Sequence, residues 1–251
     1  MTPERVYAVG DIHGWLDKLV AVHEAIEADL AARPVASHLV VHIGDYTDRG
    51  PDSRGVIDYL IDGAIEAKPW RNLYGNHDRM FLRFLQTPGG RDPMLRQDLH
   101  WLHPRLGGVE TLNSYGLNLP EAVPEETAAE IHAEAREAVP DPHIRFLTGL
   151  SDSYAWKGWF FAHAGVLPGV ALAMQDEDDL LWVRGPFLNS KRDHGAVVVH
   201  GHTPTETGEV EDHGNRIAID TGAGYGGPIG CIALEGGSAR VLGGPVLRTG
   251  D

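Results

Sequence analysis

The chain has 251 residues and a formal net charge of −15, because 36 Asp and Glu outnumber 21 Lys and Arg. This acidic balance argues against nucleic acid and anionic membranes as partners, since both attract cationic protein surfaces. The single cysteine excludes an intrachain disulfide, and no secretion signal or run of about 20 apolar residues is visible, so we expect a cytoplasmic protein.

The first part of the chain alternates short apolar runs with amphipathic stretches. The pattern predicts buried strands at 5–9, 38–43 and 70–74, connected by helices at 15–32 and 53–67. Strands and helices that alternate at this short spacing predict parallel strands joined by right-handed crossovers.

The middle segment, 79–155, lacks the alternation of strand-like and helix-like runs. Its alanine- and glutamate-rich stretch 125–138 predicts a helix. We interpret the segment in two ways. It is either a helical cap over the strand ends or a plain helical insertion without a role in substrate binding.

After residue 155 the pattern changes to short strands separated by Gly- and Pro-rich turns. These strands are predicted at 159–164, 196–200, 216–220, 229–235 and 239–242, the last two as a hairpin. We therefore predict an α/β fold in one domain, 1–251, with a second sheet packed on the first. The result would be a four-layer α-β-β-α sandwich with a helical cap insertion.

Five predicted strands end in the same kind of polar motif. The motifs are GDIHG (10–14), GDYTDRG (44–50), GNHD (75–78), HAG (163–165) and HGHT (200–203). Sites in open α/β sheets form at the carboxyl ends of strands, so we expect these motifs to converge. Carboxylate, imidazole and amide donors without thiolate suit Mn²⁺, Fe²⁺ or Zn²⁺, and there are enough for two ions. Ordinary turn chemistry explains any one motif but not all five.

These motifs resemble the calcineurin-like metallophosphoesterase superfamily, and specifically its bacterial and phage-type phosphoprotein phosphatases, from residue 6 to about 235. The resemblance implies a metal-dependent serine/threonine protein phosphatase with two divalent ions, for which Mn is expected and Fe or Zn are alternatives. A hydroxide that bridges the ions would be the nucleophile. The implied metal ligands are Asp11 and His13 for the first ion, Asp45 for both, and Asn76, His163 and His202 for the second.

The resemblance also implies roles for four residues that do not bind metal. His77 would be the general acid that protonates the leaving alkoxide, and Asp48 would orient it. An imidazole suits this task because its pKa lies near neutral pH. Arg49 and Arg184 would bind the substrate phosphate, which a guanidinium can grip with two parallel hydrogen bonds.

Some positions leave alternatives open. Tyr74 stands where many members of the family have an arginine, so the phosphate clamp lacks one cation unless Arg79 or Arg145 reaches in from the cap. His200 is expected to lie outside the ligand set, with contact to a metal as the alternative. Asp78 is expected to cap the helix that starts beside it.

Two other functions compete with a protein phosphatase. A symmetrical bis(5'-nucleosyl)-tetraphosphatase, or another nucleotide phosphohydrolase, would share the metal motifs and also lack the arginine at Tyr74. The retained Asp48 favours phosphomonoesters, so the expected partner is a phosphorylated protein or a small phosphoester. A non-catalytic scaffold would be expected to have lost ligands, and every expected position is filled here.

Overall fold

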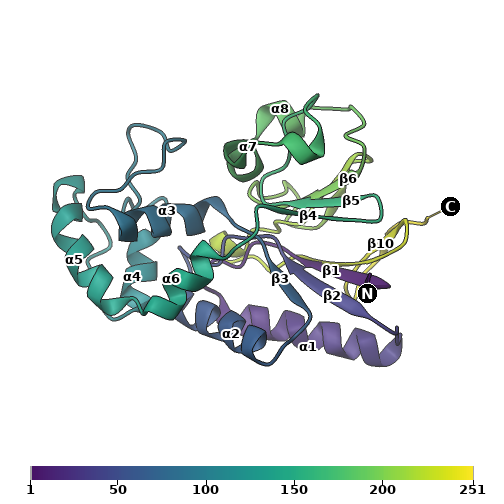
Figure 1. The fold of residues 1–251 in the computed structure, drawn as a ribbon, viewed down its shortest axis with the longest axis horizontal. Coiled ribbons are helices and arrows are strands. Elements are labelled where there is room, and N and C mark those ends of the chain that lie inside the picture. The colour runs from purple at the N-terminus through teal and green to yellow at the C-terminus, as the bar shows by residue number, and fades with distance from the viewer. Residues whose placement is uncertain (1, 251) are drawn as a thin grey trace.

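The computed structural model describes residues 2–250 and contains two mixed β-sheets that lie face to face (Figure 1). The first sheet has the strand order β11-β10-β9-β1-β2-β3. Its strands are β1 (Arg5–Val9), β2 (His38–His42), β3 (Trp70–Asn72), β9 (Cys231–Glu235), β10 (Ser238–Val241) and β11 (Val246–Arg248). The strands β1, β2 and β3 are parallel as predicted, whereas β9 pairs antiparallel with β1 and forms the predicted hairpin with β10.

The second sheet has the order β4-β5-β6-β8-β7. Its strands are β4 (Ser153–Trp156), β5 (Trp159–Ala162), β6 (Val197–His200), β7 (Glu211–Asp212) and β8 (Arg216–Ala218). Alternate residues of both sheets meet in a shared apolar layer that includes Val41, Phe161 and Ile232, all fully buried. Burial of these β-branched and aromatic side chains holds the two sheets together.

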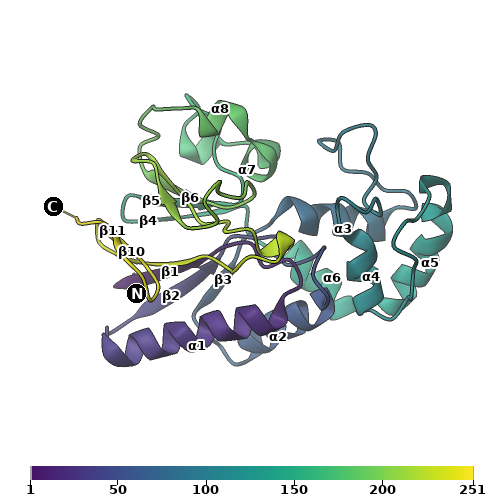
Figure 2. The same cartoon turned by 180° about the vertical axis from the view of Figure 1, so that it is seen from behind.

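Helices cover the outer face of each sheet, and Figures 1 and 2 show the resulting layers from opposite sides. The helices α1 (Leu16–Ala32) and α2 (Ser53–Ile65) pack on the first sheet, and α7 (Glu177–Trp182) and α8 (Gly185–Leu188) on the second. Two short 3₁₀ turns, η2 (Leu172–Met174) and η3 (Ala223–Tyr225), lie in the connections. The predicted α/β architecture with two packed sheets between helices is therefore confirmed. Among residues 2–250, no helix has the length and apolar character needed to span a membrane.

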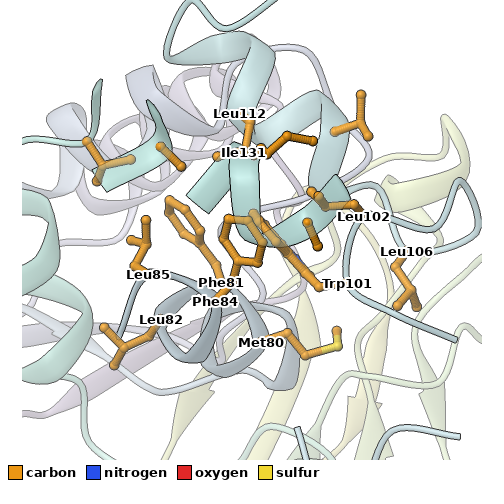
Figure 3. Packing of buried hydrophobic residues seen from close by; sticks show 14 of the residues in the cluster. Met80, Phe81, Leu82, Phe84, Leu85, Trp101, Leu102, Leu106, Leu112 and Ile131 are labelled. Atoms are coloured by element: carbon orange, nitrogen blue, oxygen red, sulfur yellow. The ribbon is translucent and has the colours of Figure 1, made fainter. Parts of the chain in front are cut away.

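The segment between β3 and β4 forms a group of helices at one side of the sandwich, which we call the cap (Figure 1). It contains α3 (Asn76–Gln86), α4 (Gly108–Ser114), the 3₁₀ turn η1 (Glu125–Thr127), α5 (Ala128–Ala138) and α6 (Asp141–Thr148). These helices share an apolar cluster, in which Phe81, Phe84 and Trp101 lie side by side (Figure 3). The ring centroids of Phe81 and Phe84 lie 5.2 and 4.8 Å from that of Trp101. The cap is thus a packed element with its own core.

A buried arginine at the start of the cap connects the cap to helix α7, which covers the second sheet. Arg79 Nε and Nη2 donate to the carboxylate of Asp92 at 2.7 and 3.0 Å. Its Nη1 donates to Glu177 at 2.8 Å and lies 2.7 Å from a carboxylate oxygen of Asp178. Because Glu177 and Asp178 belong to α7, one guanidinium joins elements about 100 residues apart in the chain.

We expect Arg79→Lys to lower the free energy of unfolding by about 1.5–3 kcal/mol, because a single ammonium cannot replace a guanidinium that binds three carboxylates at once. Urea denaturation followed by circular dichroism measures this change. Arg83→Lys is the matched control, because the Arg83 side chain is 41% exposed and its Nε lies 3.6 Å from the same Asp92. An equal loss in both variants would contradict the special role of Arg79.

Candidate metal centre

The polar motifs at the strand ends converge in the structure, although they come from both sheets and the cap. Asp11 and His13 follow β1, and Asp45, Asp48 and Arg49 follow β2. Asn76 and His77 begin α3, His163 follows β5, and His202 follows β6. All of these side chains are buried except that of Arg49, which is partly exposed. A buried polar cluster of this size is uncommon and indicates a functional site.

Asp45 lies between two groups of potential metal ligands. The first group is His13, Asp45 and His77, and the second is Asp45, His163 and His202. Asp45 Oδ2 lies 3.5 Å from His13 Nε2, and Oδ1 lies 3.3 Å from His163 Nε2. One carboxylate therefore faces imidazole nitrogens on both sides, which is the arrangement that a ligand shared by two cations requires.

The imidazoles are oriented by backbone carbonyls. His13 Nδ1 donates to Thr47 O at 2.9 Å, and His163 Nδ1 donates to Ile43 O at 3.0 Å. Since a carbonyl can only accept, these contacts leave the Nε2 lone pairs available to a cation. Asn76 Oδ1 completes the second group, at 2.8 Å from His163 Nε2 and 2.7 Å from His202 Nδ1.

Asp11 lies beside these two groups without belonging to either. Its two carboxylate oxygens accept from the backbone N–H of His202 at 3.2 and 3.0 Å. Burial, and then the neighbouring carboxylates Asp220 and Asp45, raise the pKa of Asp11 well above its usual range. Buried carboxylates that repel one another in this way favour bound cations, so the residues present fit divalent metal ions.

Asp220 belongs to this carboxylate cluster, although it lies outside the five polar motifs. It is buried, burial raises its pKa to about 6, and its Oδ1 accepts from Gly222 N at 3.0 Å. The signal was present in the sequence, because RIAID (216–220) also ends in a carboxylate followed closely by glycine. No imidazole stands beside it in the chain, unlike the motifs at 11–13 and 76–78.

His77 and Asp48 form a close pair next to the first ligand group. His77 Nδ1 lies 2.6 Å from Asp48 Oδ2, and both side chains are buried. Burial raises the pKa of Asp48 to about 8, and burial followed by the charge of Arg49 lowers the pKa of His77 to about 3. Because Arg49 Nη2 can only donate to His77 Nε2, the ring proton lies on Nδ1, which donates to Asp48.

Arg49 reaches into the site and contacts two imidazoles. Its Nη1 lies 2.8 Å from His13 Nε2, and its Nη2 lies 3.0 Å from His77 Nε2. The guanidinium carbon also lies 4.8 Å from the ring centroid of Tyr225, an exposed side chain. A cation on His13 Nε2 would use the lone pair to which Arg49 donates, so the guanidinium would have to turn away.

Arg184 stands at the edge of the site, between α7 and α8, with an exposed side chain. The pKa of His202 lies well below its usual range, because of burial, then the charge of His163 and then that of Arg184. In the described part of the chain its guanidinium makes no hydrogen bond or ion pair, so it can bind an anion.

The other candidate cations do not complete a phosphate clamp. Arg79 is bound by three carboxylates as described above, and Arg145 is exposed on α6. Tyr74 is 9% exposed and provides no positive charge. Arg49 and Arg184 therefore stay the predicted phosphate-binding arginines.

Asp78 and His200 have structural contacts. Asp78 Oδ2 accepts from Gly75 N at 3.1 Å as a helix cap, and Oδ1 accepts from Tyr46 N at 2.9 Å. His200 Nδ1 lies 3.1 Å from Gly201 O, and His200 Nε2 lies 3.1 Å from Arg216 Nη1. Protein groups therefore engage both ring nitrogens of His200.

Residues 4–229 match the family described as calcineurin-like phosphoesterase. The chain belongs to this family. The phosphoesterase is 25% identical over 245 residues to the asymmetrical bis(5'-nucleosyl)-tetraphosphatase PrpE of Oceanobacillus iheyensis, covering 88% of this chain and 85% of that protein.

Solved structures share the fold of the phosphoesterase. A protein provisionally assigned as a diadenosine tetraphosphatase superposes with a TM-score of 0.62 at 20% identity, covering 99% of this chain and 96% of that one. A cold-active protein tyrosine phosphatase superposes with a TM-score of 0.59 at 17% identity, covering 96% and 79%.

Proposed function

We propose that this phosphoesterase hydrolyses phosphomonoesters of alcohols, with phosphoserine or phosphothreonine in a protein as the substrate class. The observation that carries this proposal is the 2.6 Å contact between His77 Nδ1 and Asp48 Oδ2 beside the two ligand groups. An alkoxide is a poor leaving group and needs a proton as it departs, whereas a phosphate leaving group needs little help. A buried, oriented histidine–carboxylate pair therefore suits esters of alcohols.

The proposed metal ligands are the six that the resemblance implies, with Asp220 close by. Asp11, His13 and Asp45 would hold one divalent ion, and Asp45, Asn76, His163 and His202 the other. Ions bound there would lower the pKa of a bound water and offset the charge of the phosphate.

Arg49 and His77 would act in sequence in this mechanism. While Arg49 Nη2 donates to His77 Nε2, that nitrogen uses its lone pair as an acceptor and carries no proton to give. A cation on His13 would turn the guanidinium away, and a phosphate dianion between Arg49 and Arg184 would offer it a stronger acceptor. His77 Nε2 would then be free to bind a proton from the solvent before the reaction and donate it to the leaving oxygen, while Asp48 accepts from Nδ1.

A second candidate is the asymmetrical hydrolysis of a dinucleoside tetraphosphate. The likeness to PrpE over most of both chains favours it. Tyr225 adds a structural reason, because its ring is 71% exposed and lies 4.8 Å from the guanidinium carbon of Arg49. An exposed aromatic ring beside a phosphate-binding arginine can stack a nucleobase.

A side-by-side assay of the Mn²⁺-loaded protein separates the two candidates. We expect kcat/KM for a phosphothreonine peptide to exceed that for diadenosine tetraphosphate by ~10-fold or more, and a chelator to abolish both activities. The reverse preference, with ATP and AMP as products, would replace the first candidate with the second. Absence of hydrolysis with Mn²⁺, Fe²⁺ and Zn²⁺ would contradict both.

A further inference from the structure

The cap contacts the loop that carries Asp48 and Arg49 through a set of buried polar groups. Trp101 Nε1 donates to Asp48 Oδ2 at 2.9 Å, the same oxygen that faces His77. Thr111 Oγ1 donates to Asp48 Oδ1 at 2.7 Å and accepts from Asp48 N at 2.8 Å. Asp48 and Thr111 are fully buried, and Trp101 is 4% exposed, so water does not compete for these bonds.

The backbone of this loop is in a conformation that needs support. Asp48 and Arg49 have φ values of 74° and 69°, in the left-handed region that residues other than glycine rarely occupy. Cap groups accept from both backbone N–H groups, Thr111 Oγ1 from Asp48 and Gly107 O from Arg49 at 3.2 Å, and Ser53 Oγ of α2 also accepts from Asp48 N at 3.1 Å. Gly107 is needed for this approach, because a Cβ there would lie 2.2 Å from Arg49 N.

The side chains that make these contacts are themselves held in place. The ring of Trp101 stacks on Phe81 with an interplanar angle of 22°, and Phe84 packs beside it (Figure 3). A Cβ at Gly108 would lie 2.6 Å from Trp101, so the chain passes closely over the indole. Thr111 lies in α4, next to the fully buried Leu112. The indole N–H and the threonine hydroxyl therefore have little freedom to point elsewhere.

We infer that Trp101 and Thr111 are positioning residues for the His77–Asp48 pair, so that the cap is a working part of the catalytic site. The inference rests on the proposed function, because it assigns these residues to the proton transfer proposed for His77. Trp101 shares Asp48 Oδ2 with His77, while Thr111 holds the other oxygen and the backbone. Together they fix the direction in which the carboxylate faces the imidazole.

A loss that depends on the leaving group tests this inference. p-Nitrophenolate departs without a proton, whereas the alkoxide from a phosphothreonine peptide needs one. For Trp101→Phe and for Thr111→Val, we expect kcat on the peptide to fall ~10-fold. This loss is smaller than the ~100-fold or more expected when a general acid is removed, because the variants misalign His77 but keep it. We expect the rate on p-nitrophenyl phosphate to change less than ~2-fold, with KM and bound metal unchanged.

Three controls give the test a clear outcome. Thr111→Ser keeps the hydroxyl and should keep the peptide activity. Trp159→Phe removes another buried indole donor, which bonds Gly236 O at 2.7 Å far from the pair, and should leave both rates unchanged. In a His77→Asn background, Trp101→Phe should have no further effect, because residues that act through one group are not additive.

Equal losses on both substrates, or an undiminished effect of Trp101→Phe without His77, would overturn the inference. If Trp101→Phe fails to fold, the contrast between Thr111→Val and Thr111→Ser decides. If His77→Asn itself lowers both rates equally, the proposed acid is wrong. If His77→Asn lowers the peptide rate more than the p-nitrophenyl phosphate rate, but the cap variants lower neither or both equally, only the role of the cap would be refuted.

Discussion

Asp45→Asn should remove most of the bound divalent metal and lower phosphoester hydrolysis by more than ~100-fold. Groups that merely support a metal ligand commonly account for ~10–100-fold in affinity or activity, and Asp45 would itself be a ligand of two ions. Its two oxygens lie 3.5 and 3.3 Å from imidazole nitrogens of the two groups. An amide replaces the shared carboxylate with one neutral oxygen and an N–H₂ that binds no cation.

Metal analysis after dialysis against Mn²⁺ measures this effect directly, beside the rate on p-nitrophenyl phosphate. Asp17→Asn is the matched control, because it makes the same change of charge at an exposed position of α1. Full metal content and full rate in Asp45→Asn would mean that the ligand assignment is wrong.

His77→Asn should lower kcat on a phosphothreonine peptide by ~100-fold or more while the bound metal stays unchanged, because general acids contribute about 10²–10⁴-fold. The metal measurement matters, because His77 also lies in the first group of possible ligands. Its contact with Asp48 would suit a metal ligand supported by a carboxylate as well as an acid. Loss of one ion per chain in His77→Asn would assign His77 to the metal and leave the acid unidentified.

Asp48→Asn is the companion to this variant, since it keeps the shape of the pair and removes the carboxylate charge. We expect it to reproduce most of the loss on the peptide and little on p-nitrophenyl phosphate. His103→Asn, an imidazole in a loop of the cap whose Nδ1 accepts from Arg105 N at 3.1 Å, should change neither rate.

The motifs were readable in the sequence because strand ends and their turns are local features. A short apolar run that ends in Gly and Asp predicts a buried strand and a turn wherever it occurs, and β1 and β2 lie where such runs predicted them. The convergence of the motifs also followed from a general rule about parallel sheets. The donor types then limited the chemistry, because oxygen and imidazole together favour divalent ions.

The short elements of the second half were harder to predict. The strands β4, β7 and β11 and the helices α6, α7 and α8 were not predicted from the sequence. Strand β7 has two residues, and β4 begins directly after the cap, so neither provides enough alternation to identify a strand. Tertiary packing stabilises such elements, and local propensity contributes little.

The polar contacts of the cap could not be predicted from sequence patterns, because they join residues that are far apart in the chain. Trp101 and Asp48 are 53 residues apart, and Thr111 and Asp48 are 63 apart. Nothing near Trp101 in the sequence marks its indole as the partner of a carboxylate, because most buried tryptophans serve as core residues. Sequence patterns therefore do not decide whether the cap contributes to the site.

Local order along the chain was enough to establish the alternation of strands and helices, the polar strand ends and the chemical class of the donors. Pairing between distant segments needed the folded molecule: β9 returns to β1, Arg79 joins the cap to α7, and Trp101 faces Asp48. The physical reason is that turns and amphipathic faces depend on neighbouring residues. Contacts between distant segments depend on how whole apolar faces pack. Many different apolar sequences can fill the same core, so the sequence of one segment does not identify its partner.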